Sequence, residues 1–219
     1  MNNFKAVIFD MDGVLVDNHD SWCVFDRKFL AEFGIIPDKD YEVFVNGRSQ
    51  EEVVLWVKEH YKLNESVKKM MASKQNWIKK VYEVESKPMP GVENLLKKIK
   101  RNNLRLALCS GAKMWMIKII LDRFNWHDYF AVVVSSDHVG YKGKPNPEIY
   151  LYTAKLLKIA PADCVVIEDA ENGVKAAKDA GMKCIGFKDL RFNLPDDLSK
   201  ADLIINSFED KRFLDFLSI

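Results

Sequence analysis

Six short apolar runs, separated by segments with helical periodicity, constrain the fold of this chain most strongly. The runs lie at residues 6–9, 104–109, 131–134, 164–167, 184–187 and 203–205. Strands that alternate with helices form a parallel sheet, because each strand needs a crossover connection to reach the next one. The sequence therefore predicts an α/β fold in which helices flank one parallel sheet.

The segment from residue 18 to residue 86 departs from this alternation. It shows helical periodicity, as in Trp22, Phe25 and Phe29, and no convincing strand. The prolines within residues 87–91 then end the helical segment and lead back to the strand and helix pattern. Two connections would let such an insertion hinge as a lid. We predict a main domain and an inserted helical domain, formed respectively by residues 1–17 with 87–219 and by residues 18–86.

Charge and hydropathy limit the classes of binding partner and the cellular location that we expect. The 33 Lys and Arg residues nearly balance the 32 Asp and Glu residues, so the net charge of +1 provides no long-range field for a polyanion such as DNA. The first residues lack the basic start and apolar stretch of a secretory signal, and no run approaches the ~20 apolar residues of a membrane helix. We expect a cytoplasmic monomer that binds neither nucleic acid nor membrane.

The four cysteines form no Cys-x-x-Cys pair, and three of them lie in apolar runs. This distribution is typical of reduced core residues rather than of metal ligands or disulfides. We interpret all four in this way: Cys23, Cys109, Cys164 and Cys184.

Polar residues follow the predicted strands at the sheet edge where parallel sheets bind ligands. They are Asp10 and Asp12 after the first run, Ser110 and Gly111 after the second, Lys144 before the helix that follows the third, and Glu168 and Asp169 after the fourth. Each has an ordinary explanation, as a turn residue, a helix cap or a solvated lysine. Their joint placement at one edge favours a functional site.

Four carboxylates at that edge form a candidate metal site: Asp10, Asp12, Glu168 and Asp169. They cannot all stay ionised without a nearby cation, because like charges and desolvation raise their pKa values. Oxygen ligands without neighbouring His or Cys favour Mg²⁺. We predict Asp10 and Asp169 as direct ligands, with Glu168 binding directly or through a water.

The segments that contain these residues resemble the haloacid dehalogenase superfamily, in its phosphatase and phosphomutase branch with an inserted helical cap. The resemblance covers essentially the whole chain and rests on residues 9–17 (FDMDGVLVD), 110–111 (SG), 143–147 (GKPNP) and 167–173 (IEDAENG). It implies a Rossmann-like core, a Mg²⁺ ion and an aspartyl-phosphate intermediate. Haloacid dehalogenases themselves do not use the second aspartate, so Asp12 favours phosphorus chemistry over halogen chemistry.

This resemblance leads to a role for each core residue. Asp10 attacks the substrate phosphorus, while protonated Asp12 donates its proton to the departing oxygen. Asp12 then deprotonates the water that cleaves the aspartyl phosphate. Ser110, the Gly111 amide and Lys144 hold the phosphate oxygens, because phosphoryl transfer depends mainly on positioning and electrostatics.

Two cap residues, Arg48 and Lys74, are predicted to contact the leaving group of the substrate. Arg48 lies in the loop of residues 46–49, which corresponds in similar proteins to a loop that reaches toward the substrate. Ser49 and Glu52 form a plausible capping box after this loop. The cap tryptophans are more typical of a helical core than of a ligand platform: Trp22, Trp56 and Trp77.

The chain is therefore predicted to be a Mg²⁺-dependent phosphatase that hydrolyses a small phosphorylated metabolite. One alternative is a β-phosphoglucomutase-like sugar phosphomutase. Another is a non-catalytic phosphorylation switch similar to response-regulator receivers, although receivers are shorter and lack a helical insertion.

Two differences from β-phosphoglucomutases favour hydrolysis. Those mutases carry a histidine shortly after the first turn, where this chain has Trp22; His19 lies three residues away and is the residue that could compensate. Polar residues that would hold a second phosphate are replaced by Ala112 and Met114, which leaves Lys113. Two lost hydrogen-bonding side chains would weaken the binding of a bisphosphate.

Overall fold

The chain divides into two compact units, Met1–Asp17 with Lys87–Ile219 and Asn18–Ser86. We call them the core unit and the cap unit. The computed structural model describes residues 4–45, 50–140, 143–192 and 196–219, except for the side chains of residues 23, 42 and 43. The division between the units falls at the residues where the sequence places the insertion.

A six-stranded sheet forms the centre of the core unit, and each of its strand pairs is parallel. In spatial order its strands are β5 (Val132–Val134), β4 (Arg105–Cys109), β1 (Ala6–Phe9), β6 (Cys164–Glu168), β7 (Lys183–Phe187) and β8 (Leu203–Ile205). All six predicted runs form strands, so the α/β class is confirmed. The order places β1 between β4 and β6, and the candidate site residues follow these three strands.

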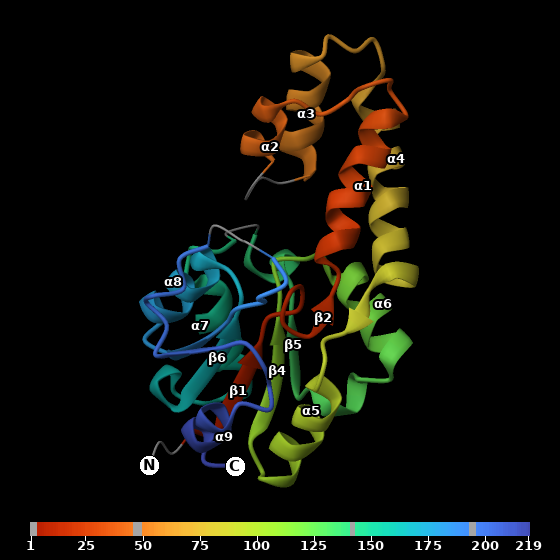
Figure 1. Cartoon of the computed structure of the whole chain (residues 1–219). Coiled ribbons are helices and arrows are strands. Elements are labelled where there is room, and N and C mark those ends of the chain that lie inside the picture. Colours follow the sequence, from red (N-terminus) through yellow and green to blue (C-terminus); the bar gives the residue numbers. More distant parts are fainter. Residues whose placement is uncertain (1–3, 46–49, 141–142, 193–195) are drawn as a thin grey trace. The chain divides into compact units, whose positions relative to one another are not determined.

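Helices cover both faces of this sheet (Figure 1). One face is covered by α7 (Glu148–Leu157) and α8 (Glu171–Asp179), and the other by α5 (Val92–Arg101) and α6 (Met114–Phe124). The amphipathic pattern of α5 explains its place, because its buried residues recur at helical spacing: Val92, Leu95, Leu96 and Ile99. The unit also contains α9 and three 3₁₀ helices, at Lys211–Leu217, His127–Tyr129 (η2), Ser136–Val139 (η3) and Pro161–Asp163 (η4).

The described residues of the cap unit contain helices and no strand. The helices are α1 (His19–Ala31), α2 (Lys39–Phe44), α3 (Gln50–His60), α4 (Val67–Lys80) and the π-helical turn η1 (Val81–Glu85). The side chains of Asp38 and Ser66 cap α2 and α4 by accepting backbone hydrogen bonds. The predicted capping box cannot be compared with the structure, because Ser49 lies outside the described residues.

Two very short strands, β2 (Val16–Asp17) and β3 (Lys87–Pro88), connect to the two ends of the cap unit. They pair in antiparallel register, with Val16 opposite Pro88 and Asp17 opposite Lys87. Two-residue strands carry no recognisable apolar pattern, so the sequence does not predict them. Their pairing places the two ends of the insertion side by side.

Three cysteines, Cys109, Cys164 and Cys184, are buried and free. This placement agrees with their interpretation as reduced core residues. The side chain of Cys23 lies outside the described part of the chain.

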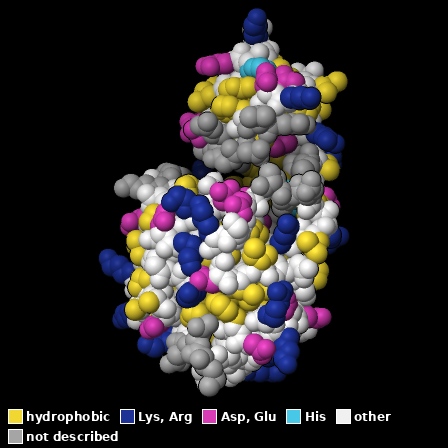
Figure 2. All heavy atoms as spheres, turned by 60° about the vertical axis from the view of Figure 1, so that its left-hand side comes forward, with side chains coloured by type: hydrophobic (Ala, Val, Ile, Leu, Met, Phe, Trp, Pro, Cys, Tyr) yellow, Lys and Arg dark blue, Asp and Glu magenta, His cyan; other side chains and the backbone are white. Residues whose placement is uncertain are grey.

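Charged side chains of both signs lie on the surface (Figure 2). Positive and negative side chains are interspersed on the face drawn in Figure 2, in keeping with the net charge of +1. Within the described ranges, each helix is too short or too polar to span a membrane.

Candidate active site

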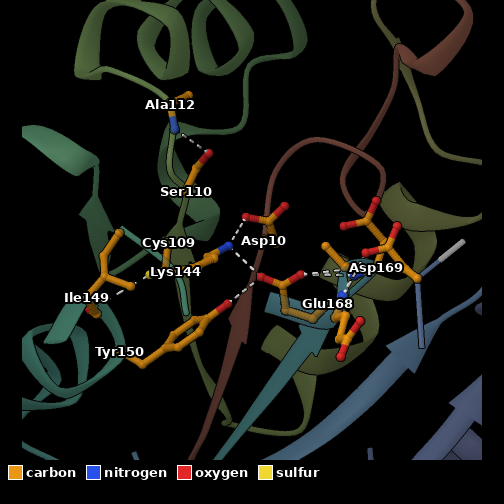
Figure 3. Close-up of polar contacts among 12 residues, drawn as sticks. Asp10, Cys109, Ser110, Ala112, Lys144, Ile149, Tyr150, Glu168 and Asp169 are labelled. Atoms are coloured by element: carbon orange, nitrogen blue, oxygen red, sulfur yellow. Dashed lines mark hydrogen bonds and ion pairs between the residues drawn. The ribbon is translucent and has the colours of Figure 1, made fainter. Parts of the chain in front are cut away.

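Asp10 follows β1 directly and lies at the centre of the candidate site (Figure 3). Its backbone N–H donates to the Ile167 carbonyl oxygen at 3.0 Å, which continues the pairing of β1 with β6. Its side chain is only 11% exposed. Burial raises the pKa of Asp10 to about 7, while the Lys144 ammonium opposes this rise and the Glu168 carboxylate adds to it.

Lys144 joins two carboxylates of the site. Its Nζ atom lies 2.5 Å from Asp10 Oδ1 and 2.5 Å from Glu168 Oε1. Burial would lower the pKa of this lysine, but Asp10 and Glu168 together hold it well above its ordinary value. Lys144 therefore stays charged and compensates part of the negative charge of the site.

Four donors fix the Glu168 carboxylate. Oε1 accepts hydrogen bonds from Lys144 Nζ and, at 2.7 Å, from the Tyr150 hydroxyl. Oε2 accepts hydrogen bonds from the backbone N–H groups of Asp169 at 3.1 Å and Ala170 at 3.2 Å. A carboxylate has about four acceptor positions, so these contacts use its hydrogen-bonding capacity.

Two glycines leave the space that the carboxylates occupy. Gly13 has a φ of +75°, and a Cβ atom at this position would overlap Asp169 Oδ2. Gly173 lies in the first turn of α8, and a Cβ atom there would overlap the Glu168 carboxylate. A side chain at either position would displace the carboxylate that lies against it.

Asp10, Glu168 and Asp169 bring oxygen atoms within 4.8 Å of one another. Burial, followed by Glu168 and Asp10, raises the pKa of Asp169 well above its ordinary range. Lys144 supplies one positive charge to three crowded carboxylates, so the donor set fits a hard divalent cation. Asp12, which the sequence also placed in the acidic set, does not belong to this group of three.

Ser110 and Gly111 follow β4, the neighbour of β1 in the sheet. The Ser110 hydroxyl is buried and accepts a hydrogen bond from the Ala112 N–H at 3.0 Å. Helix α6 begins at Met114, whose N–H donates to Asp137 Oδ2 at 2.8 Å. Gly111 is exposed, and a Cβ atom there would meet no described atom within 4 Å.

Lys74, which is predicted to contact the leaving group, is buried among the cap helices. Its side chain is only 1% exposed, and its Nζ atom lies 3.3 Å from Asp26 Oδ1. The same atom lies 5.3 Å and 4.8 Å from the ring centroids of Phe25 and Phe29. Lys74 is therefore an internal residue of the cap helices, and the contacts described for its ammonium group are with other cap residues. The other predicted cap contact, Arg48, lies outside the described residues.

The sequence interpretation missed Tyr150 and the role of Gly173. Tyr150 lies on the buried face of α7, where the helical pattern indicates only a core residue. A buried tyrosine normally needs a hydrogen-bond partner for its hydroxyl group. That requirement is the one signal in the sequence that points from Tyr150 to a polar neighbour.

Comparisons with known proteins place the chain in a family. A family model for haloacid dehalogenase-like hydrolases matches residues 7–187. A phosphorylated carbohydrates phosphatase of Thermotoga maritima is 33% identical over 181 residues, which cover 83% of each protein. A beta-phosphoglucomutase of Bacillus subtilis is 32% identical over 189 residues, 83% of this chain and 82% of that protein.

One further relative is much longer than this chain. The bifunctional riboflavin kinase/FMN phosphatase of Arabidopsis thaliana is 32% identical over 219 residues. The match covers 95% of this chain and 54% of that protein, so the chain spans about half of its length.

Solved structures have the same fold. The crystal structure of beta-phosphoglucomutase from Clostridium difficile matches with a TM-score of 0.76 at 28% sequence identity, and the match covers 98% of this chain and 96% of the other. The family model covers most of the chain, and relatives above 30% identity match over most of their length. The chain belongs to the haloacid dehalogenase-like hydrolase family.

Proposed function

We propose that this protein is a Mg²⁺-dependent phosphatase that hydrolyses a small phosphorylated metabolite through an aspartyl-phosphate intermediate on Asp10. The observation that carries the proposal is the Asp10 carboxylate, which lies at the end of β1 within 2.5 Å of the Lys144 ammonium and beside further carboxylates. Relatives that act as phosphatases on phosphorylated carbohydrates and FMN support a phosphate ester as substrate. A cytoplasmic, monomeric enzyme is part of the proposal.

The chemistry proceeds in two steps on two aspartates. Asp10 attacks phosphorus and forms the acyl phosphate, while Asp12 donates a proton to the departing oxygen. Asp12 then accepts a proton from the water that hydrolyses the intermediate and regenerates Asp10. Lys144 favours the ionised nucleophile, and Ser110 and Gly111 donate hydrogen bonds to the phosphate oxygens.

Asp10 and Asp169 would hold the Mg²⁺ ion, with Glu168 beside it. When bound, the ion neutralises negative charge on the carboxylates and on the phosphate oxygens. The chain itself supplies the close approach of the carboxylates, which Gly13 and Gly173 permit. Burial, with a further contribution from the neighbouring carboxylates, raises the pKa values of Asp10 and Asp169, and a bound cation would oppose this rise.

The first test measures phosphate release from para-nitrophenyl phosphate and from a panel of phosphorylated metabolites, with and without Mg²⁺. We expect Mg²⁺-dependent turnover that Asp10→Asn abolishes. A phosphorylated protein that never turns over would contradict a phosphatase. Family membership already leaves the receiver-like switch without support.

A sugar phosphomutase is the second candidate, because a beta-phosphoglucomutase is 32% identical to the chain. Two features favour hydrolysis instead. Trp22 packs edge-on against Phe25 and Tyr82, with centroid distances of 5.5 Å and 5.7 Å, and cannot take the part of the histidine expected of such mutases. Ala112 and Met114 follow the phosphate-binding turn and offer no side-chain hydrogen bond to a second phosphate.

A phosphatase and a mutase can be distinguished by the product that each forms from the same substrate. The enzyme is given β-glucose 1-phosphate and a bisphosphate primer, and glucose 6-phosphate and free phosphate are followed together. We expect free phosphate to form faster. Faster formation of the isomer would make the protein a mutase.

A further inference from the structure

We propose that Tyr150 is a positioning residue: its hydroxyl fixes the Glu168 carboxylate, which in turn holds the Lys144 ammonium against Asp10. This inference rests on the proposed phosphatase function and adds to it a residue that acts through two others. It concerns the described contacts of α7 with the end of β6.

Tyr150 connects the apolar core to the polar site. Its side chain is fully buried, and it belongs to the hydrophobic cluster between the sheet, α7 and α8. Its hydroxyl donates to Glu168 Oε1 at 2.7 Å, and Figure 3 shows the ring reaching toward that carboxylate from α7. Burial and the Glu168 carboxylate raise the pKa of Tyr150 well above its ordinary value, so the hydroxyl remains a donor.

The contacts of Glu168 separate its two oxygen atoms by function. Oε2 is held by the two backbone amides at the start of α8. Oε1 is shared by Tyr150 and Lys144. The last torsion of a glutamate side chain is soft, so the amides fix one oxygen and the hydroxyl restricts where the other can lie.

Lys144 depends on this oxygen more than a rigid side chain would. A lysine ammonium ends a flexible four-carbon stem and has three donors, of which Asp10 and Glu168 take two. The Tyr150 ring centroid also lies 5.4 Å from Lys144 Nζ. Replacement by phenylalanine keeps this ring and removes only the hydrogen bond.

A packing role does not account for the hydroxyl group. Phenylalanine would fill the same apolar space without a partner, whereas a buried hydroxyl is costly unless it forms a hydrogen bond. The partner described for Tyr150 is the carboxylate that contacts Lys144. The hydroxyl therefore adds order to the polar site.

The first experiment compares Tyr150→Phe with Tyr152→Phe, a control on the same helix. We expect Tyr150→Phe to lower kcat for para-nitrophenyl phosphate by about 10-fold with KM within about threefold, because Lys144 matters most in the transition state. The melting temperature should change little, and the control should match the wild type. Equal kcat values for the two variants would overturn the inference.

A double-mutant cycle tests whether Tyr150 acts through Lys144. In a Lys144→Met background, Tyr150→Phe should lower the rate by less than about twofold, since the group that it positions is already gone. The same loss of about 10-fold in both backgrounds would show a separate role and would overturn the inference.

Inhibition by orthovanadate provides a second measurement that does not depend on folding of the Lys144 variant. Vanadate resembles the transferring phosphoryl group, so Tyr150→Phe should raise its inhibition constant by about 10-fold while the affinity for inorganic phosphate stays the same. An unchanged vanadate constant would contradict the proposal. Failure of the wild type to release phosphate from any substrate would instead remove the proposed function, which keeps the two failures distinct.

Discussion

The core and cap units each contain a lysine that is largely buried beside a carboxylate. The two lysines differ in their exposure, in the number of carboxylates that they contact and in their other neighbours. Lys144 in the core unit is 14% exposed and contacts Asp10 and Glu168, each at 2.5 Å. Lys74 in the cap unit is 1% exposed and contacts Asp26 at the longer distance of 3.3 Å. The remaining neighbours of the Lys74 ammonium include two phenylalanine rings.

The two lysines therefore have opposite pKa shifts. Burial lowers the pKa of Lys74, and the single carboxylate of Asp26 only partly opposes this effect. For Lys144 the two carboxylates outweigh burial, and its pKa is raised. The number of nearby opposite charges, rather than burial alone, decides the shift. The core lysine belongs to the candidate active site, whereas the cap lysine is part of a helical interior.

The largest expected effect is the loss of phosphate release when divalent ions are removed from the core carboxylates. The carboxylates of Asp10, Glu168 and Asp169 lie close together, and Lys144 contacts two of them, so we expect a chelator to reduce phosphate release to background and Mg²⁺ to restore it. The measurement is the steady-state rate before chelation, after chelation and after Mg²⁺ is added back. An undiminished rate in chelator would show that the core cluster is not a metal site.

The next largest effect is expected when the aspartate beside each lysine is replaced, because kcat should fall in the core variant and not in the cap variant. Asp10→Asn should lower kcat by at least about 1,000-fold, because the amide is a poor nucleophile. Asp26→Asn is the matched control in the cap unit and should keep kcat within about threefold. Both are measured with para-nitrophenyl phosphate. If Asp10→Asn retains more than about a tenth of the rate, another residue is the nucleophile.

Replacement of each lysine should again lower kcat more in the core unit than in the cap unit, but by a smaller factor than replacement of the aspartates. Lys144→Met should lower kcat by about 100-fold, since it removes positive charge from the phosphoryl transfer step. Lys74→Met should leave kcat within about threefold. Melting curves of both variants show whether the protein is folded in each assay. If both variants are folded and lose kcat equally, Lys144 has no more influence on catalysis than Lys74, which would contradict the prediction.

The smallest expected effect is a change in stability with pH in the metal-free protein. Asp10 has a pKa of about 7 in the folded protein, above its ordinary value of 3.8, so the folded state binds its proton more tightly. Its contribution to stability is complete below about pH 4 and is lost as the pH rises through about 7.

Asp10→Asn should remove this dependence, so the melting temperatures of the wild type and the variant are compared from pH 4 to 8. We expect the wild type to lose roughly 10 °C relative to the variant over this interval. Asp26→Asn serves as the control in the cap unit. A constant difference between wild type and Asp10→Asn would mean that Asp10 does not titrate in this range.

The sheet could be predicted from the sequence because strands buried on both faces produce continuous apolar runs. The strand bounds differ by one residue from the predicted runs: residues 104 and 131 lie just outside β4 and β5, whereas Glu168 is the last residue of β6. Strand ends in a parallel sheet meet at one edge, which is why the grouping of Asp10, Lys144, Glu168 and Asp169 could also be predicted.

Residue contacts that depend on side-chain direction could not be predicted. Lys74 has a polar side chain on a lysine-rich helix, and nothing in its spacing indicates that it points inward toward Phe25 and Phe29. Tyr150 reaches Glu168 across a gap of 18 residues in sequence, from a helix to a strand end. Periodicity identifies the buried face of a helix and does not identify which polar group lies opposite it.

The pairing of β2 with β3 affects how easily the inserted segment between them could be lengthened, shortened or replaced. Val16 lies opposite Pro88, so the core unit itself holds together the points where the cap unit leaves and returns. The entropy of closing a loop grows only slowly with its length once the ends are adjacent. A longer, shorter or different insertion at this point would therefore place little thermodynamic burden on the sheet. If a short turn replaced the cap unit, the two strands would form an ordinary hairpin.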